Sequence, residues 1–351
     1  MHETNKGGRR MERSEKNNKI MVWKIGALGD ILMTTPFVRE LRKKYKKVRI
    51  DYYVGKKSSQ ILKNNPNIDR VIEIDETIFN KRTNILKINK IIQTIKLIKK
   101  IKKEGYKEVY VLDKHWIYPL IMRLSGIKKV VGFYRDKLDR LLLSKAIYYN
   151  EPKHEIDYYL SLINKEDTKN KKMDYFLTRE EIKEAKLFMN KMNLKKKSYI
   201  VVINSGGYHP GERMIRMMPD KLFKQLLREL SKKYKIVLVG GPNDKNYYDK
   251  FLTKNIINAA GKLSIGGSIA LMKQAKRIYT TDCGPMHMAA TVNDNITAIF
   301  GPTNPKRKAP RVKNLKVIWK DQDIYEKEYE DYGRVPKNKR FMEKVKIEDL
   351  I

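Results

Sequence analysis

The stretch KIMVWKIGALGDILMTTPFVRELRKKY, residues 19–45, joins a predicted strand to a predicted helix through a glycine-containing turn. Apolar and β-branched residues fill the segment that ends at Gly26, which is typical of a buried strand. The turn ALGD follows, and apolar residues at helical spacing then predict a helix from Ile31 to about Tyr45. A strand that leads through a glycine turn into a helix favours an α/β fold with a parallel sheet.

The same alternation continues through both halves of the chain. In the N-terminal half we expect strands at 48–55, 69–75, 106–113 and 128–133, and helices at 58–65 and 84–105. In the C-terminal half we expect helices at 179–193, 219–234, 268–275 and 285–293, and strands at 198–207, 235–244, 277–282 and 296–303, the last of these being the final strand. We therefore infer two Rossmann-like, doubly wound parallel-sheet domains, with ligands expected where the C-terminal strand ends of both face a central cleft.

The length of 351 residues suits two domains, and a polar, Lys/Glu-rich region separates the two alternating halves. We expect the following boundaries: a disordered basic N-terminal extension at 1–19, an N-terminal domain at 20–165, a linker at 166–178, a C-terminal domain at 179–325, and a C-terminal tail or helix at 326–351 that packs back on the N-terminal domain.

Positive charge dominates the composition. The chain has 77 Lys and Arg residues against 40 Asp and Glu, a formal net charge of +37. Such a surface favours polyanionic partners, and nucleic acid, an anionic membrane and a phosphorylated glycolipid would all respond to it. A genome biased toward Lys codons would also produce part of this excess without selection for binding.

The single cysteine, Cys283, excludes an internal disulfide and a zinc site built on several thiolates, which suits a reducing cytosol. No long uncharged apolar run could span a bilayer, and the polar opening has no apolar signal-peptide core. We expect a cytoplasmic protein with at most peripheral contact to the cytoplasmic face of the inner membrane.

The predicted helix at 84–105 has two interpretations. Isoleucines recur in it at helical spacing, lysines fill the opposite face, and Gly105 marks its end. It fits a surface helix of an α/β domain, with the isoleucines facing the sheet and the lysines in water. It also fits a basic amphipathic helix that lies on a membrane. We favour the first, which is the commoner arrangement.

Four glycine turns follow predicted strands: GALGD at 26–30, NSGG at 204–207, VGGPND at 239–244 and DCGPMH at 282–287. Such turns place backbone N–H groups at one point, where an anion can bind. None matches the phosphate loop of nucleoside-triphosphate hydrolases, and GALGD lacks the three glycines of the dinucleotide fingerprint. Hydrolysis of nucleoside triphosphates and hydride transfer are therefore disfavoured.

The turn DCGPMH carries the most chemistry. Pro285 suits the first helical position, so Asp282 lies at the strand end and His287 in the first helical turn. An acid beside exposed N–H groups can accept from sugar hydroxyls while the N–H groups donate to a diphosphate. In the purely structural alternative Asp282 is a helix cap, His287 a satisfied buried histidine and Cys283 a small apolar filler. A metal held by Asp282 and His287 lacks a third and a fourth ligand nearby.

Seven segments follow one another in order along the chain: KIGALGDILMTTPFVRELRKKY at 24–45, GFYRDKLDRLLLS at 132–144, KHEIDYYL at 153–160, NSGGYHPGERMIRMMPDKLFKQL at 204–226, VLVGGPND at 237–244, AAGKLSIGGSIALMKQAKRIYTTDCGPMHMAA at 259–290 and AIFGPTNP at 298–305. These segments resemble glycosyltransferase family nine, the heptosyltransferase family of lipopolysaccharide synthesis. The resemblance implies the GT-B fold, two Rossmann-like domains with the nucleotide-sugar donor bound by the C-terminal one.

The resemblance also implies roles for residues. Asp30 takes the position of the proposed catalytic base, and Asp282 and His287 those of contacts to the donor's sugar and diphosphate. Arg216 takes the lysine position of a Lys-x-Trp-Pro segment and Met218 its tryptophan position, and Arg keeps the charge but not the shape of Lys. For Asp30 the structural alternative is a helix N-cap. Further donor-binding candidates in and beside the turns are Ser205, Gly206, Asn243, Lys262, Gly284 and Pro285.

By the same resemblance the N-terminal domain binds the acceptor, a phosphorylated lipid-linked saccharide core. Candidate acceptor contacts are Gly29, Thr34, Asp113, His115 and Arg135, together with the stretch DKHW at 113–116 and the basic helix around Lys96 to Lys103.

The function implied is an inverting glycosyltransferase that moves a sugar, as heptose from ADP-heptose, to a lipopolysaccharide-type acceptor without a metal or other cofactor. Two alternatives remain open: a sugar-binding homologue that has lost catalysis, and a nucleic-acid-binding protein. The sequence offers no stacking platform or recognised nucleic-acid module for the latter. It leaves the oligomeric state undetermined.

Overall fold

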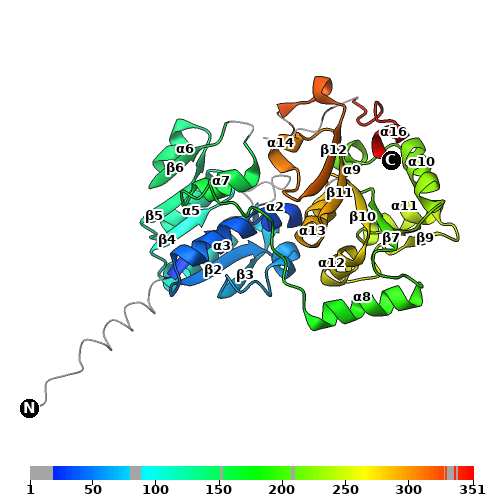
Figure 1. Cartoon of the computed structure of the whole chain (residues 1–351). Helices are drawn as coiled ribbons and strands as arrows, with labels where there is room; N and C mark the ends of the chain where they lie inside the picture. Colours follow the sequence, from blue (N-terminus) through cyan, green and yellow to red (C-terminus); the bar gives the residue numbers. More distant parts are fainter. Residues whose placement is uncertain are drawn as a thin grey trace, which may run out of the picture. The chain divides into compact units, whose positions relative to one another are not determined.

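The chain folds into two compact units, residues 1–170 and 171–351, shown in Figure 1. The computed structural model describes residues 19–79, 88–150, 153–206, 210–327, 329, 336 and 339–351. Apart from Lys19, the expected extension at 1–19 lies outside the described residues. The boundary between the units falls inside the expected linker 166–178, which contains no helix or strand.

The N-terminal unit is built on one parallel sheet, which has six strands in the described residues and the order β3-β2-β1-β4-β5-β6. The strands are β1 (Lys19–Trp23), β2 (Arg49–Gly55), β3 (Arg70–Ile74), β4 (Glu108–Val111), β5 (Lys129–Tyr134) and β6 (Lys145–Tyr148). The helices are α2 (Leu28–Met33), α3 (Thr35–Lys44), α4 (Ile88–Glu104), α5 (Ile117–Leu124), α6 (Lys137–Leu141) and α7 (Glu155–Ser161), with 3₁₀ helices at Lys56–Ile61 and Glu76–Phe79.

The C-terminal unit repeats this topology with the strand order β12-β11-β10-β7-β8-β9. The strands are β7 (Tyr199–Ile203), β8 (Lys235–Leu238), β9 (Ile256–Asn258), β10 (Arg277–Thr281), β11 (Asn295–Phe300) and β12 (Asn314–Trp319). The helices are α8 (Arg179–Lys191), α9 (Pro210–Arg216), α10 (Asp220–Ser231), α11 (Lys245–Tyr248), α12 (Ile265–Gln274), α13 (Gly284–Val292), α14 (Pro305–Lys308) and α16 (Ile347–Leu350), with 3₁₀ helices at Pro242–Asp244, Asp249–Phe251 and Gln322–Ile324.

Each sheet reverses its strand order once, and this point fixes where a ligand can bind. In the first sheet the reversal lies between β1 and β4, where Ile20 pairs with Glu108. In the second it lies between β7 and β10, where Ile200 pairs with Arg277. Ligands of doubly wound sheets bind outside the carboxyl ends of the strands at this switch point. The two predicted α/β domains with parallel sheets are confirmed.

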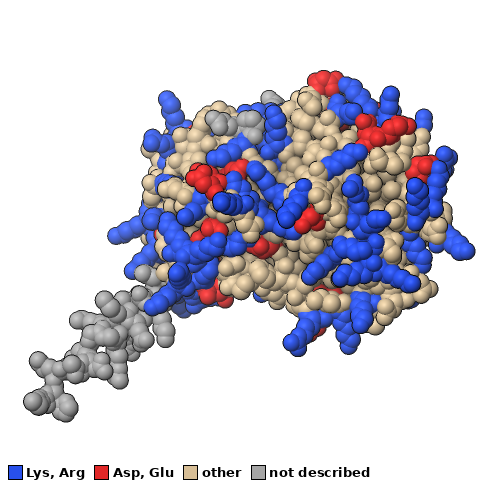
Figure 2. Space-filling view, viewed as in Figure 1, with Lys and Arg blue, Asp and Glu red and all other residues tan. Residues whose placement is uncertain are grey.

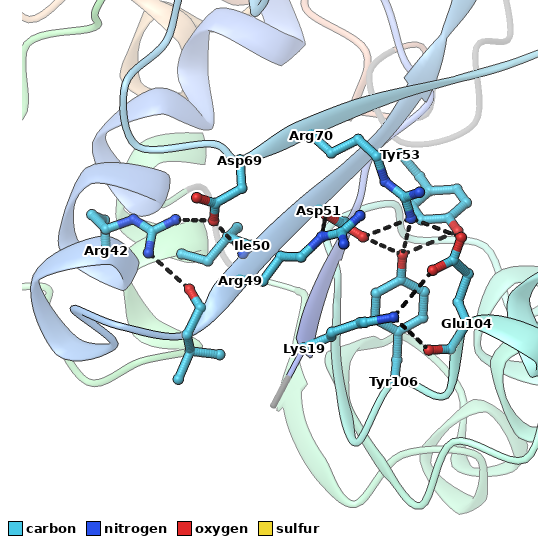
Figure 3. Close-up of polar contacts among 11 residues, drawn as sticks. Lys19, Arg42, Arg49, Ile50, Asp51, Tyr53, Asp69, Arg70, Glu104 and Tyr106 are labelled. Carbon is cyan, nitrogen blue, oxygen red and sulfur yellow. Dashed lines mark hydrogen bonds and ion pairs between the residues drawn. The ribbon is translucent and has the colours of Figure 1, made fainter. Parts of the chain in front are cut away.

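A polar network closes the opposite, amino-terminal end of the first sheet (Figure 3). Asp51 is completely buried and accepts hydrogen bonds from Arg49 Nε at 2.9 Å, Arg70 Nη2 at 2.8 Å and the Tyr106 hydroxyl at 2.6 Å. Glu104, at the end of α4, pairs with Arg70 at 2.9 Å and with Lys19 at 3.4 Å. A buried carboxylate is stable only when paired in this way. The network therefore ties the first residues of β1, β2 and β3 to the end of α4.

Three predictions of elements need correction. The helix predicted from Ile31 to Tyr45 is interrupted at Thr34, so that α2 and α3 are separate. Residues 296–303 do not contain the last strand, because β12 pairs with β11 along its whole length. Residues 56–61 form a 3₁₀ helix in place of the helix expected at 58–65.

The helix α4 ends at Glu104, and Gly105 follows it with a positive φ of 69°, as the sequence indicated. Its isoleucines do not all face the sheet, however. Leu97 and Ile101 are buried in the core of the N-terminal unit, whereas Ile88, Ile91, Ile92 and Ile95 are exposed. The favoured interpretation as a surface helix with its lysines in water is confirmed, but the isoleucines of its first half do not reach the sheet.

The C-terminal segment also differs from expectation. It was expected to pack on the N-terminal domain, but Met342, Val345 and Leu350 are buried in the core of the C-terminal unit. There they contact the helix α10, whose Leu222, Leu226 and other apolar residues face the sheet. Among residues 326–351, the structure does not describe 328, 330–335, 337 and 338.

Candidate functional site

The carboxyl end of the first sheet holds a cluster of charged groups at its switch point. Lys24 follows β1 and Asp113 follows β4, and the Lys24 Nζ lies 2.7 Å from Asp113 Oδ1. The second oxygen of Asp113 accepts a hydrogen bond from the Ile25 backbone N–H at 2.7 Å. Because Lys24 and Asp113 are largely buried, this pair is held in a fixed geometry.

Asp30 lies in the first turn of α2, beside this pair. A Cβ atom placed on Gly26 would lie 3.0 Å from Lys24 Nζ and 3.3 Å from Asp30 Oδ2, so both charges border the Cα of Gly26. Burial acts to lower the pKa of Lys24, but Asp113 and Asp30 outweigh it and raise that pKa above its usual range. The N-cap of α2 is Ala27, so Asp30 is not the helix cap of the structural alternative.

A second cation follows directly on Asp113. Lys114 Nζ pairs with Glu155 Oε2 of α7 at 2.5 Å and lies 3.8 Å from the ring centre of Tyr149, whose hydroxyl also donates to Glu155. Burial lowers the pKa of Lys114 to about 8, against the raising effect of Glu155. Arg135, which follows β5, lies 5.1 Å from the same Tyr149 ring. These groups extend the charged cluster around Asp113.

The predicted acceptor contacts divide into two groups. Asp113 and Arg135 belong to the charged cluster, and His115, half-buried, stacks on Trp116 next to it. Gly29 and Thr34 are buried; the Thr34 hydroxyl bonds the Ile31 carbonyl at 2.7 Å and the Tyr52 hydroxyl at 2.8 Å. Thr34 thus serves packing between α2 and β2, and the prediction that it contacts a ligand is not supported by its position.

The switch point of the second sheet is built around Asp282, which follows β10. Asp282 is buried and accepts a hydrogen bond from the Thr303 hydroxyl at 2.6 Å. Arg216 Nη1 lies 3.3 Å from Asp282 Oδ2, and Arg216 Nε donates to the Tyr329 hydroxyl at 2.6 Å. The lysine position of the family motif is therefore filled by a guanidinium that contacts the predicted donor-binding carboxylate.

The charges around Asp282 keep it ionised. Burial acts to raise the pKa of Asp282, but Arg216, Lys308 and His287 together lower it below its usual range. His287 is buried in the first turn of α13, close enough to Asp282 to act on it. An ionised carboxylate only accepts hydrogen bonds, so Asp282 can hold hydroxyl groups.

The helix α13 begins one residue earlier than the sequence predicted, so Pro285 is its second residue and not its first. Gly284 and Pro285 are its first two residues, and the N-cap is Cys283, not Asp282. Cys283 is buried, and burial raises the pKa of its thiol to about 12, so the thiol is inert. The interpretation of Cys283 as a small filler is confirmed, and that of Asp282 as a helix cap is wrong.

Ser205 and Gly206 lie beside Asp282 because β7 neighbours β10. The Ser205 N–H donates to the Thr281 hydroxyl at 3.2 Å, and the Thr281 hydroxyl donates to the Ser205 carbonyl at 2.8 Å. A Cβ on Gly206 would lie 2.0 Å from the Arg213 carbonyl oxygen. Glycine is thus required here so that α9, which carries Arg216, can pack closely against the end of β7.

Asp244, the last residue of the turn VGGPND, has structural partners. It is buried, pairs with Arg213 at 2.8 Å, and accepts from the Gly241 N–H at 2.9 Å and the Ser205 hydroxyl at 3.2 Å. Asn243 and Lys262 are exposed, after β8 and in the turn after β9. The structure thus brings most of the predicted donor-binding residues together at the switch point and leaves these two at its outer side.

The sequence of this chain matches a known protein family. The sequence model of glycosyltransferase family 9 (heptosyltransferase) matches residues 94–334, more than half of the chain. This chain belongs to glycosyltransferase family 9. It is therefore a glycosyltransferase of the GT-B fold, as its segments indicated.

Several relatives of this glycosyltransferase match it along most of their length. Lipopolysaccharide heptosyltransferase 1 of Campylobacter coli is 28% identical over 321 residues, which cover 86% of this chain and 89% of the relative. A solved family 9 glycosyltransferase of Veillonella parvula superposes with a TM-score of 0.73 at 23% identity, covering 86% of this chain and 87% of its own. The ADP-heptose lps heptosyltransferase II of Escherichia coli superposes at 0.68 and 20% identity, covering 86% and 90%.

Sequence reasoning missed several residues of the glycosyltransferase's two clusters: Lys24, Glu155, Arg213, Thr303 and Tyr329. Most of them lie in segments that carried the resemblance, next to residues that were named: Lys24 precedes GALGD, Glu155 lies in KHEIDYYL and Thr303 in AIFGPTNP. The signal available in the sequence was that such residues come shortly after a predicted strand, or lie in a segment that faces one.

Proposed function

We propose that this glycosyltransferase transfers a heptose from an ADP-activated donor to a lipopolysaccharide-type acceptor, with inversion at the anomeric carbon. The observation that carries the proposal is Asp282, a buried carboxylate kept ionised beside Arg216 at the switch point of the second sheet. A carboxylate next to a cation and a helix N-terminus suits a ligand that has both hydroxyls and a diphosphate. The choice of heptose and ADP follows the names of the relatives.

On the donor side, we assign Asp282 to hydroxyl groups of the donor. Arg216, the start of α13 with Gly284 and Pro285, and the turn with Ser205 and Gly206 surround the diphosphate, with His287 in the same turn as Gly284. As the glycosidic bond breaks, negative charge grows on the leaving diphosphate, and fixed cations and N–H groups stabilise it. We propose that these groups replace a metal ion.

On the acceptor side, we assign Asp30 as the general base. It takes the proton of the acceptor hydroxyl while that oxygen bonds to the anomeric carbon and the bond to the diphosphate breaks. Asp113 pairs with Lys24, and this ion pair keeps the Lys24 ammonium group next to the Asp30 carboxylate. Lys114 and Arg135 offer cations to an anionic acceptor.

We place the reaction at the cytoplasmic face of the inner membrane, where a lipid-linked acceptor would lie. Across the described ranges of the chain, the structure contains no helix that is long and apolar enough to cross a membrane. We propose that contact with the bilayer is peripheral.

The test is the variant Asp30→Asn. We expect it to slow release of the nucleoside diphosphate in the presence of acceptor by about 10²- to 10⁴-fold, the usual contribution of a general base. Thermal stabilisation by the donor should stay as in the wild type, because Asp30 lies in the other unit from the donor residues. Asp136→Asn, an exposed change in the same unit, is the matched control and should keep full activity.

Two outcomes would contradict the proposal. Full transfer by Asp30→Asn with the donor still bound removes Asp30 as the base. Loss of activity on treatment of the wild type with a chelator, restored by a divalent cation, contradicts transfer without a metal.

A further inference from the structure

Four isoleucines of α4 form an exposed apolar stripe in the N-terminal unit. Ile88, Ile91, Ile92 and Ile95 are exposed by 68%, 39%, 44% and 46%. Their spacing of three and four residues places them along one side of the helix. An exposed contiguous apolar stripe on a globular protein indicates an interaction surface.

The same helix is strongly basic. It carries six lysines, Lys90, Lys96, Lys99, Lys100, Lys102 and Lys103, and its one acid, Glu104, pairs with Lys19 and Arg70. Lys96 and Lys99 follow Ile92 and Ile95 by one helical turn, so the apolar stripe leads directly into cations. Isoleucines flanked by lysines on an exposed face are the composition of a helix that lies in an anionic membrane interface.

Neighbouring helices add to this surface. The helices α4 and α5 cover the same face of the first sheet, because Leu97, Ile101, Ile121 and Met122 share one core cluster. The helix α6 follows on that face by the right-handed crossover rule, since β4, β5 and β6 succeed one another in one direction. On α6, Leu138 and Leu141 are more than three-quarters exposed, and they alternate with Lys137 and Arg140.

The exposed stripe lies toward the same edge of the sheet as Asp30. The end of α4 is fixed at the amino edge, where Glu104 bonds the first residues of β1 and β3. The helix runs back from there by about 1.5 Å per residue, so Ile91 lies on the order of 20 Å away, toward the carboxyl edge. Trp116, exposed at the start of α5, and Leu138, at the start of α6, belong to that edge too.

We propose that the exposed face of α4, continued by α6, docks the N-terminal unit on an anionic phospholipid bilayer. The isoleucines enter the interface and the lysines meet the lipid phosphates. Docking on this face brings the edge that carries Asp30 to the bilayer. The proposal extends the proposed function, in which the acceptor is lipid-linked, but it stands on exposure and charge alone.

The charge of the whole chain does not by itself select this face. In Figure 2, Lys and Arg side chains lie over both units in the view shown. General attraction to anions would therefore involve either unit. The combination of exposed isoleucines with lysines is the feature that makes α4 specific, and it sets the design of the test.

The experiment measures co-sedimentation of the full chain with vesicles of phosphatidylcholine, with and without phosphatidylglycerol, in the absence of donor and acceptor. Ile92→Ser with Ile95→Ser tests the apolar stripe, and its matched control is Ile182→Ser with Leu187→Ser, two similarly exposed residues on α8 of the other unit. Lys96→Glu with Lys99→Glu tests the charge.

The charge variant has a control with the same net charge. Lys221→Glu with Lys224→Glu changes two exposed lysines on α10 of the C-terminal unit. All four pairs are exposed, so the variants should fold, and far-ultraviolet circular dichroism with a melting curve checks this.

We expect the wild type to bind only the vesicles with phosphatidylglycerol. The isoleucine variant should bind about tenfold more weakly, since two partly inserted side chains lose their apolar burial. The lysine variant should bind at least about 30-fold more weakly, because loss of the two lysine charges alone removes about 1 kcal/mol each and the new carboxylates also repel the lipid phosphates. Both controls should stay within about twofold of the wild type.

Two results would overturn the proposal. If the α10 control loses as much affinity as the α4 lysine variant, binding follows net charge and not this face. If the chain ignores vesicles but forms a dimer that the isoleucine variant dissociates, a second copy covers the stripe. Because the vesicles contain no saccharide acceptor, vesicle binding can be interpreted even if the proposed transfer reaction is wrong.

Discussion

Replacement of Arg216 by methionine tests whether this cation keeps the buried Asp282 ionised. Methionine keeps much of the side-chain volume and removes the charge that lies 3.3 Å from Asp282 Oδ2. Removal of one partner from a buried ion pair costs about 3–5 kcal/mol. Asp282 retains its hydrogen bond from Thr303, and Arg216 is partly exposed. We therefore expect a loss of about 2–3 kcal/mol in the free energy of unfolding of the C-terminal unit.

The pH dependence of this loss identifies its cause. In the wild type the pKa of Asp282 is lowered, so its ionised form contributes stability above the ordinary pKa of Asp, about 4, and that contribution disappears as the pH falls through the folded value. In the Arg216→Met variant, Asp282 is still buried but has lost the cation that most strongly lowers its pKa. Its ionised form therefore lowers the free energy of unfolding at neutral pH. The difference in Tm should be largest near pH 7 and should shrink below about pH 4.

Differential scanning calorimetry of the full chain measures this difference. A loss of this size lowers the Tm of a unit of this length by about 5–10 °C at neutral pH. Arg228→Met is the control, because Arg228 is exposed and pairs with Glu229 on the surface, and its Tm should not change measurably. A difference between wild type and Arg216→Met that stays constant down to pH 3 would refute the electrostatic explanation and leave packing as the cause.

Three further changes test the clusters and the scaffold. Lys24→Met should reduce kcat by about tenfold or more and move the acid limb of the pH–rate profile to higher pH, because Asp30 loses a neighbouring cation; unchanged kinetics would separate Lys24 from Asp30. Gly206→Ala should lower the free energy of unfolding by about 1–3 kcal/mol and weaken donor binding, since the Arg213 main chain must move; a variant with wild-type Tm and donor affinity contradicts this. Asp51→Asn should cost about 2–3 kcal/mol, read as a lower Tm of the N-terminal unit with unchanged donor affinity.

The central strands were predictable because they are buried on both sides. The strands β1, β2, β4, β7, β8, β10 and β11 all lie within the sheets and read as near-continuous apolar runs. The strands that the sequence did not reveal, β6, β9 and β12, are all edge strands. An edge strand pairs on one side only and buries less; in β12 the successive residues Lys316 and Val317 are both exposed, so both of its faces reach solvent.

The candidate site was predictable where a turn follows a strand and not where a distant residue completes the cluster. Asp282 and Ser205 come one and two residues after β10 and β7, and Asp30 lies in α2, the helix that follows β1; all three were found. Glu155 lies on α7 and Tyr329 lies in the chain after β12. They contact Lys114 and Arg216, respectively, only in the folded chain. A residue that completes a network from another element has no characteristic spacing from its partner in the sequence, so only the folded structure reveals it.

The helix α4 shows why periodicity alone placed too many isoleucines in the core. Successive residues of an α-helix advance by about 100°, so Ile92, nine residues before Ile101, lies about half a turn from it around the helix. Ile101 is buried, and Ile92 must then face away from the sheet. Apolar residues that cover more than one face cannot all reach a single sheet, and the remaining face needs another partner. The sequence thus already contained the surplus stripe, and the structure identifies which of its isoleucines remain exposed.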